Sequence, residues 1–207
     1  MCILMGVLLL AVPACYRIHG AGRTEQMLKQ FEQALEDTAD GGAGQGMGED
    51  GAEAVPAQEH PVLSEADAAL LAGENVIGII EIKALDIKYP ILEGAGNEQI
   101  RYAIGHIPET AGIGGMGNCV LCGHNGSRNG TFFTHLNQIK QGDVVRLTDS
   151  AGEVHLYEVS ETFITGAYDN TVKDSSGEEL LTLLTCANHG TQRFICRCVP
   201  ARDEQNQ

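Results

Sequence analysis

Short runs in which apolar and polar residues alternate fill the chain after Glu74, with the period of two that is typical of β-strands. The alternation is clearest in EVHLYEV, residues 153–159. Turns rich in Gly, Asn and Asp separate the runs, and no long helical period interrupts them. We therefore predict one β domain over residues 74–200, an antiparallel barrel or sandwich. Its predicted strands are VIGIIEI, IKYPIL, NCVLCG, DVVRLT, EVHLYEVSETFI, LLTLLT and QRFICRCV.

The pattern before this domain is different. Residues 1–16, MCILMGVLLLAVPACY, are apolar and uncharged, which predicts a membrane anchor, although the run is slightly short for a span of about 20 residues. The alternative is a signal-like segment that is cleaved or carries lipid on Cys15. Residues 17–73 are interpreted as a stalk. In it, TEQMLKQFEQALED has helical spacing with Thr24 as N-cap, SEADAALLAG is a short helix, and a Gly- and acid-rich stretch between them is a flexible tether. Residues 201–207 form a tail.

Composition narrows the possible partners. The 207 residues contain 28 Asp+Glu against 13 Lys+Arg, and binding to nucleic acid needs clustered positive charge, so we expect no nucleic-acid partner. The seven cysteines are an odd number, so disulfides cannot use all of them. The remaining thiol is a candidate nucleophile, although a cysteine is more often a small buried apolar residue.

Three residues at the ends of predicted strands could carry chemistry. Cys186 ends LLTLLTC, and a thiol acts as a nucleophile only as thiolate, with a base or a cation nearby. His124 lies where NCVLCG enters a Gly/Asn loop, and its ordinary pKa suits general acid/base chemistry. Arg193 begins the strand after Cys186, so a tight antiparallel pairing brings its guanidinium close to the thiol, where it could stabilise an oxyanion.

Each of these residues also has an ordinary explanation when it is taken alone. Cys186 could be a core thiol, His124 an exposed loop residue and Arg193 a surface arginine at a strand edge. Arg197 competes with Arg193, because it lies four residues further along the same strand face. The interpretation therefore depends on the three residues occurring together and in this order.

In that order the residues resemble the sortase family of cysteine transpeptidases. TLLTC, residues 182–186, resembles the TLxTC signature of sortases; GHN fits the segment that holds the family's histidine, and QRFICR fits the strand that holds its arginine. The stretch NGTFFTHLNQIKQGDVVRL also resembles the family's sequence after the histidine. The short connection between residues 165 and 180 is typical of the compact class A or D sortases, while GENVIGIIEI and GHN are similar to segments of class B.

The resemblance implies an eight-stranded β-barrel with short helices and assigns roles to single residues. Cys186 is the expected nucleophile, His124 the general acid/base and Arg193 the group that stabilises the transition state, while Thr185 and Leu183 shape the floor of the substrate groove. The implied reaction cleaves a C-terminal sorting motif of surface proteins through a thioester. An amine of a peptidoglycan precursor or a pilin lysine then resolves the thioester. The resemblance implies no cofactor, and it places the enzyme at the cell membrane with its catalytic domain outside.

A non-catalytic β module that binds zinc or a protein partner is the alternative. CxxC is a common zinc half-site, but CVLC lies within a β run, and CxC on a strand has poor geometry for chelation. Core packing is the default for these cysteines, and a disulfide is open to them if the domain is exported. No calcium site is evident. The zinc ligands in this alternative would come from Cys119, Cys122, Cys196 and Cys198, together with Cys186 and His124. The loops expected to select a peptide are residues 105–117 and 165–177.

Overall fold

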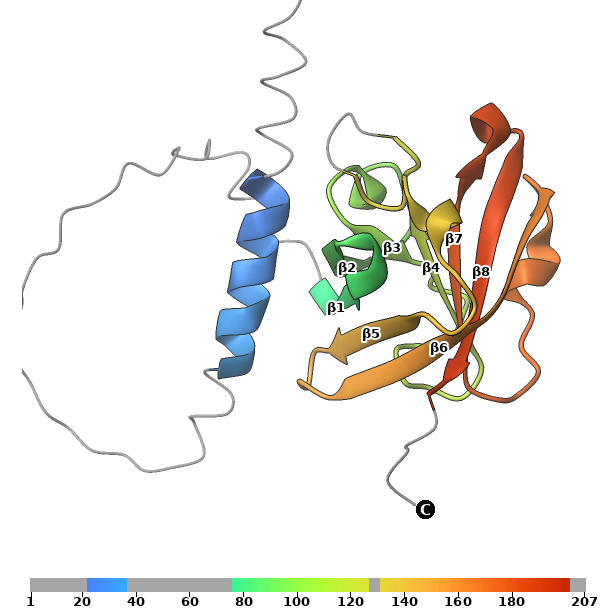
Figure 1. The fold of residues 1–207 in the computed structure, drawn as a ribbon. Helices are drawn as coiled ribbons and strands as arrows, with labels where there is room; N and C mark the ends of the chain where they lie inside the picture. Colours follow the sequence, from blue (N-terminus) through green and yellow to red (C-terminus); the bar gives the residue numbers. More distant parts are fainter. Residues whose placement is uncertain (1–21, 37–75, 127–130, 202–207) are drawn as a thin grey trace, which may run out of the picture.

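A closed barrel of eight strands forms the centre of the part of the chain that this computed structural model describes, residues 22–36, 76–126 and 131–201 (Figure 1). Around the barrel the strands follow the order β1-β2-β3-β4-β7-β8-β6-β5. The strands are β1 (Val76–Ile82), β2 (Ile87–Glu93), β3 (Ile104–His106), β4 (Asn118–Gly123), β5 (Val144–Asp149), β6 (Val154–Gly166), β7 (Leu180–Ala187) and β8 (Gln192–Pro200). Short 3₁₀ helices connect them: η1 (Lys83–Leu85), η2 (Gln99–Arg101), η3 (Leu136–Gln138), η4 (Asn170–Lys173) and η5 (Asn188–Gly190).

The predicted all-β barrel is confirmed, and each of the seven predicted strand segments forms a strand. The eighth strand, β3, falls at the start of a stretch that we predicted to be a loop. Its three residues are all buried, so they show no alternation between an apolar and a polar face. A strand this short and this buried gives no periodic signal in the sequence.

The prediction of a purely antiparallel sheet is wrong. Strand β2 pairs parallel with β3, and β4 pairs parallel with β7. The chain between β4 and β7 forms β5 and β6 on the way, which is the kind of long crossover that a parallel pair requires. The apolar pattern of a strand shows which residues face the core, but it does not show the direction of the neighbouring strand.

Alternate residues of the strands fill the inside of the barrel, and burying each large side chain contributes about 1.5–3 kcal/mol. Cys119, Cys196 and Cys198 belong to this core, as the default interpretation predicted. The two Sγ atoms of Cys196 and Cys198 are 3.7 Å apart, and the five cysteines of the described ranges are all free thiols. The large core residues include Ile80, Ile82, Ile91, Ile104, Leu121, Phe132, Phe133, Leu136, Leu147, Tyr157, Leu181 and Leu183.

A helix of residues 22–36 packs beside β1 and β2 (Figure 1). Its Met27 is buried against Leu92 and Ala103, which accounts for the apolar positions of the predicted helix. Thr24 lies inside the helix and its hydroxyl donates to the carbonyl of Tyr102 at 2.7 Å, so the prediction that Thr24 is the N-cap is wrong. No helix in the described ranges is long and apolar enough to cross a membrane. The predicted anchor, tether and second short helix lie outside those ranges.

Candidate active site

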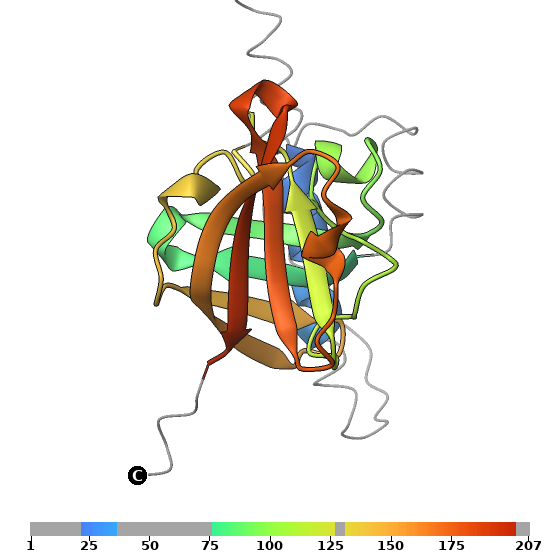
Figure 2. The same ribbon diagram turned by 90° about the vertical axis from the view of Figure 1, so that its right-hand side faces the viewer.

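The strand register brings His124, Cys186 and Arg193 into one row across three neighbouring strands. Strands β4 and β7 run parallel with Gly123 beside Thr185, so the next residues, His124 and Cys186, continue side by side. Strands β7 and β8 run antiparallel, and Cys186 pairs directly with Arg193. Directly paired residues present their side chains on the same face of a sheet. Figure 2 shows β6, β8, β7 and β4 side by side, with the η5 turn beyond the ends of β7 and β8.

Cys186 lies within β7, one residue before its end, and not at the point where the strand stops. The apolar run ends at Thr185, but the pairing with β8 continues to Ala187. The chain then reverses through Asn188, His189 and Gly190, which all have positive φ. This tight left-handed turn explains why so short a connection returns Arg193 to the level of Cys186. The Cys186 side chain is partly exposed.

His124 follows a glycine that allows close packing at the end of β4. A Cβ on Gly123 would lie 2.7 Å from Ile104 Cδ1 and 2.8 Å from Phe133 Cδ2, so no larger residue fits there without displacement. His124 is an exposed residue, but the partial burial of its ring, and next the charge of Arg101, lower its pKa below the ordinary value. The imidazole is therefore largely neutral at pH 7 and able to accept a proton.

Of the two candidate arginines, Arg193 is the one that lies beside the thiol. Its Nη1 donates to the carbonyls of Gly190 and Gln192, both at 2.9 Å. Arg197 pairs with Thr182 further along the strands, and its Nη1 donates to Glu161 Oε1 at 3.1 Å. Arg197 is thus occupied away from Cys186.

Thr185 and Leu183 lie on the opposite side of β7 from Cys186. The Thr185 hydroxyl donates to the carbonyl of Gly123 at 2.8 Å, and the residue is 2% exposed. Leu183 is fully buried in the barrel core. Neither side chain offers surface to a ligand here, so any influence of these two residues on a substrate groove is indirect, through the seating of β7 against β4.

Asn125 is a residue of the site that our sequence analysis did not single out. Its Nδ2 donates to the carbonyl of Cys186 at 2.7 Å and so ties the end of β4 to the end of β7. This bond fixes the His124 backbone relative to the Cys186 backbone. The only signal in the sequence was the position of Asn125 next to the candidate histidine in GHN.

A second row, of mostly apolar residues, lies behind the first on the same face of the sheet. In it Cys122 pairs with Leu184, Leu184 with Ile195, and Ile195 with Phe163. Ile195 and Cys122 are buried, while Leu184 and Phe163 are partly exposed. The face that carries the reactive row is therefore apolar just beyond it.

The cysteines that the structure describes do not come together as the zinc site of the alternative hypothesis requires. Burial raises the pKa of Cys119 to about 12 and that of Cys122 to about 11, so both thiols stay protonated at neutral pH. Their positions, three residues apart on β4, also face opposite sides of the sheet. Within the described ranges no cysteine takes part in a group of three potential metal ligands.

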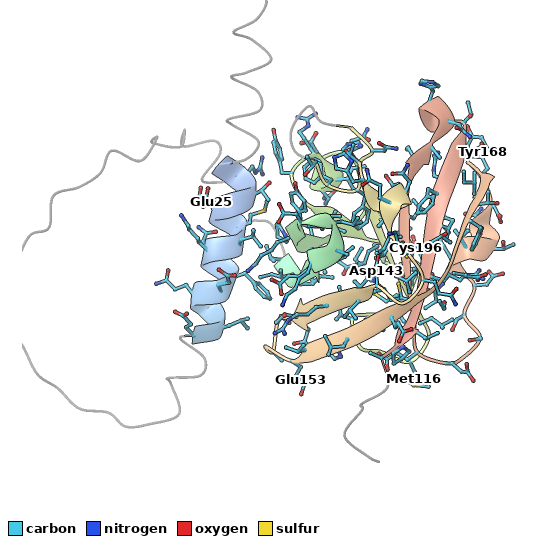
Figure 3. All side chains as sticks on the ribbon, viewed as in Figure 1. Glu25, Met116, Asp143, Glu153, Tyr168 and Cys196 are labelled. Carbon is cyan, nitrogen blue, oxygen red and sulfur yellow. The ribbon has the colours of Figure 1, made fainter. Side chains whose placement is uncertain are left out.

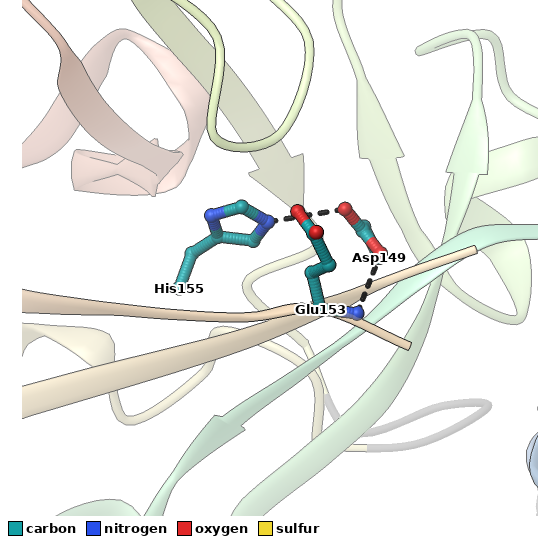
Figure 4. Close-up of side chains that lie close together, drawn as sticks. All are labelled: Asp149, Glu153 and His155. Carbon is teal, nitrogen blue, oxygen red and sulfur yellow. Dashed lines mark hydrogen bonds and ion pairs between the residues drawn. The ribbon is translucent and has the colours of Figure 1, made fainter. Parts of the chain in front are cut away.

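The one such group in the described ranges lies on the hairpin between β5 and β6 and consists of Asp149, Glu153 and His155 (Figure 4). Asp149 Oδ1 accepts hydrogen bonds from the backbone N–H groups of Ala151 and Glu153, and Oδ2 lies 3.1 Å from His155 Nε2. These bonds account for the cluster as a stabilised turn, without a metal ion. The hairpin also lies far from the row of candidate residues. Along β6, at about 3.3 Å per residue, His155 is roughly 30 Å from Thr165, the residue that pairs with Arg193.

The barrel and the row of candidate side chains suggest a class of protein, and comparison with known proteins identifies it. The sortase domain family matches residues 80–201, so the chain belongs to the sortase family. It is 34% identical to sortase A of Streptococcus agalactiae serotype III over 127 residues, which are 58% of this chain and 51% of that protein. It is 32% identical to sortase D of Bacillus subtilis over 110 residues, 53% of each chain. The chain thus spans about half the length of these curated relatives.

Solved structures confirm the fold. A Clostridium perfringens Sortase D5 transpeptidase superposes with a TM-score of 0.60 at 22% identity, over 87% of this chain and 96% of that one. A lid mutant of sortase A from Corynebacterium diphtheriae gives a TM-score of 0.59 at 21% identity, over 86% and 96% of the two chains.

Proposed function

We propose that the protein is a cysteine transpeptidase that cleaves an LPxTG-like sorting motif near the C-terminus of exported proteins. It then transfers the cleaved protein to an amine of the cell wall or of a pilus. The observation that carries this proposal is the row formed by His124, directly after β4, with Cys186 on β7 and Arg193 on β8 of a sortase domain.

In the first half of the reaction, the sulfur of Cys186 attacks the carbonyl carbon of the Thr–Gly-type bond. His124 takes the thiol proton and gives it to the amine that leaves, so a thioester forms and the C–N bond breaks. In the second half, the acceptor amine attacks the thioester, a new amide forms, and the thiol recovers its proton. The neutral form of His124, which its lowered pKa favours, suits the first proton transfer.

Arg193 is the proposed donor to the oxyanion of both tetrahedral intermediates. A guanidinium has five N–H groups, and the two on Nη1 are used on the carbonyls of Gly190 and Gln192. Within the described ranges, the three on Nε and Nη2 have no hydrogen-bond partner. The arginine is therefore held by its own turn with donors in reserve, as a preorganised oxyanion site requires.

The apolar row behind the reactive side chains is the proposed seat for the apolar side chain that opens the sorting motif. It supplies Leu184 and Phe163, both partly exposed, on the face that carries Cys186. The loop of residues 165–177 adds Tyr168, which is 94% exposed and directed outward (Figure 3). We propose that this loop, which begins beside Arg193, selects the peptide. Residues 107–117 instead lie at the other end of the barrel, with Gly114 against His155, so the prediction that they also select the peptide is wrong.

In this proposal the N-terminal segment holds the enzyme at the cell membrane, with the barrel outside. The partners are then sorting-signal peptides of surface proteins and an amine acceptor, which is a peptidoglycan precursor or a pilin lysine.

The test is to incubate the full chain with a panel of sorting-motif peptides, with and without an excess of triglycine, and to analyse the protein by mass spectrometry. We expect an acyl group on Cys186 and a peptide–triglycine product. Cys186→Ala should form neither while staying folded, and Cys119→Ala, at a thiol of the barrel core, should form both. Turnover by Cys186→Ala overturns the proposal. Hydrolysis alone in the presence of excess amine removes the transfer half and leaves a peptidase.

A further inference from the structure

Phe132 has a backbone conformation that a bulky residue rarely adopts. Its φ is 35°, in the left-handed region, and its side chain is only 1% exposed. Such a conformation persists only where surrounding contacts impose it, and outliers of this kind concentrate near functional sites. Phe132 lies eight residues after His124, so the contacts that hold it are relevant to the site.

Tyr89 of β2 supplies those contacts. The rings of Tyr89 and Phe132 are 4.9 Å apart between centroids. The Tyr89 hydroxyl accepts a hydrogen bond from the backbone N–H of Thr131 at 3.1 Å and lies 2.9 Å from Thr131 Oγ1. The residue next to Phe132 is thereby fixed to β2 by two bonds to one hydroxyl.

The same segment is also fixed to the end of β4. The backbone N–H of Phe133 donates to the carbonyl of His124 at 3.1 Å, and the N–H of Gly126 donates to Thr134 Oγ1 at 3.0 Å. Phe132 thus lies between two anchored strands. Its ring stands edge-to-face with the His124 ring, at 6.5 Å between centroids and 61° between planes.

We propose that Phe132, held in its left-handed conformation by Tyr89, is a positioning residue that orients the His124 imidazole toward Cys186. This inference rests on the proposed function for its effect on catalysis, but the contact itself is independent of it. A ring packed edge-to-face restricts rotation of the imidazole and keeps water from one of its sides. Within the described ranges, the His124 side chain makes no hydrogen bond, so packing is what limits its orientation there.

Two observable properties follow from this arrangement. Burial is the main cause of the lowered pKa of His124, so removing the Phe132 ring should raise that pKa toward its ordinary value. Arg101 of η2 is the other group that lowers this pKa, Cys186 of β7 lies next to His124 in the row, and Arg193 of β8 lies beyond Cys186; none of the three is changed in the variants. A freer imidazole should also spend less time aligned with the thiol, which lowers kcat more than it raises KM.

The experiment compares three variants of the full chain by an NMR titration of His124 and by the pH profile of peptide acylation. The His124 signal is assigned by its absence from His124→Gln. For Phe132→Leu we expect a raised His124 pKa, an acid limb of activity displaced to higher pH and a loss of kcat of about 10-fold. Tyr89→Phe, which removes only the hydroxyl, should change all three in the same direction by less. Phe133→Leu is the matched control, because it removes a neighbouring buried ring whose close contact is with Gly123, while the ring contact of His124 is with Phe132.

The proposal is overturned if Phe132→Leu and Tyr89→Phe leave the His124 titration unchanged, or if Phe133→Leu changes it equally. Should Phe132→Leu fail to fold, Tyr89→Phe decides the question. If the wild-type chain acylates no peptide, the proposed function fails, while the titration still decides whether Phe132 positions His124.

Discussion

Two ends of the same barrel carry polar side chains in close groups, and the groups differ in how much of their bonding capacity is already used. On the β5–β6 hairpin, both carboxylate oxygens of Asp149 have partners within the hairpin. In the row at the other end, the Cys186 thiol and the His124 ring make no side-chain hydrogen bond to any described residue. Arg193 there uses only Nη1.

The difference distinguishes a structural cluster from the candidate catalytic one. Hydrogen bonds within a turn stabilise it and occupy the atoms that make them, so the Asp149 carboxylate has little left for a ligand. A row whose members are held by backbone register and by packing keeps its donors and acceptors for a substrate. Proximity of titratable side chains is therefore a weaker sign of an active site than unused bonding capacity next to a rigid scaffold.

The comparison is tested most severely by replacing one histidine from each end. We expect His124→Ala to lower kcat/KM for a sorting-motif peptide by about 10³-fold, because acid/base catalysis by a positioned side chain contributes about 10²–10⁴-fold. His155→Ala should change kcat/KM by less than about 2-fold, because the hairpin takes no part in the reaction. Steady-state kinetics on folded protein, checked by circular dichroism, measures both. Equal losses in the two variants would contradict the separation of the two ends.

The next largest effect is expected from the arginines of β8. Arg193→Ala should lower kcat by about 10²-fold, the usual cost of removing one oxyanion donor. Arg197→Ala removes a guanidinium from the same strand face but one that binds Glu161, so we expect only a small loss of stability and near-normal kcat. The two variants are compared by single-turnover acylation. A larger loss for Arg197→Ala would show that the wrong arginine was assigned to the oxyanion.

The sequence was sufficient for the parts of the fold that depend on local pattern. Strands β1 and β4 have the predicted bounds. Cys186 was predicted at the end of its strand, but the backbone pairing of β7 with β8 continues two residues past the apolar run, to Ala187. The resemblance to sortases supplied the count of eight strands, which the pattern alone did not. Strand β3 gave no alternation because all three of its residues are buried.

The candidate residues of the site could be listed from the sequence, but their arrangement in space could not. The pairing of Cys186 with Arg193 followed from a short antiparallel connection, whereas the approach of His124 depends on the parallel pairing of β4 with β7. The bond from Asn125 to Cys186 joins residues 61 apart in the chain, and the left-handed φ of Phe132 depends on Tyr89. Such features arise from tertiary packing, and single-sequence patterns carry no information on them.

A smaller effect should come from the bond that ties the two strand ends together. Asn125→Ala removes one side-chain hydrogen bond worth about 1 kcal/mol, so we expect kcat to fall about 5-fold with KM little changed, as the separation of His124 and Cys186 becomes less fixed. Asn137→Ala, at an exposed asparagine of η3, is the matched control and should have no effect. Peptide cleavage kinetics decides the matter, and an increase in KM alone would point to a contact with substrate instead.

The smallest effect is expected at the hairpin, in stability and not in activity. Although burial acts to raise the pKa of Asp149, hydrogen bonds from His155 and from the Glu153 and Ala151 backbone outweigh it and lower that pKa. A carboxyl group whose pKa is lowered by folding stabilises the fold above its unfolded pKa, near 4, and loses that contribution as the pH falls through the folded value. Asp149→Asn should therefore reduce the free energy of unfolding at pH 7 by about 1 kcal/mol, which corresponds to about 2–4 °C in Tm. The difference from wild type should shrink at pH 3, with kcat unchanged at pH 7. Thermal unfolding at both pH values measures it, and a loss of activity without a loss of stability would mean that the two ends of the barrel are coupled after all.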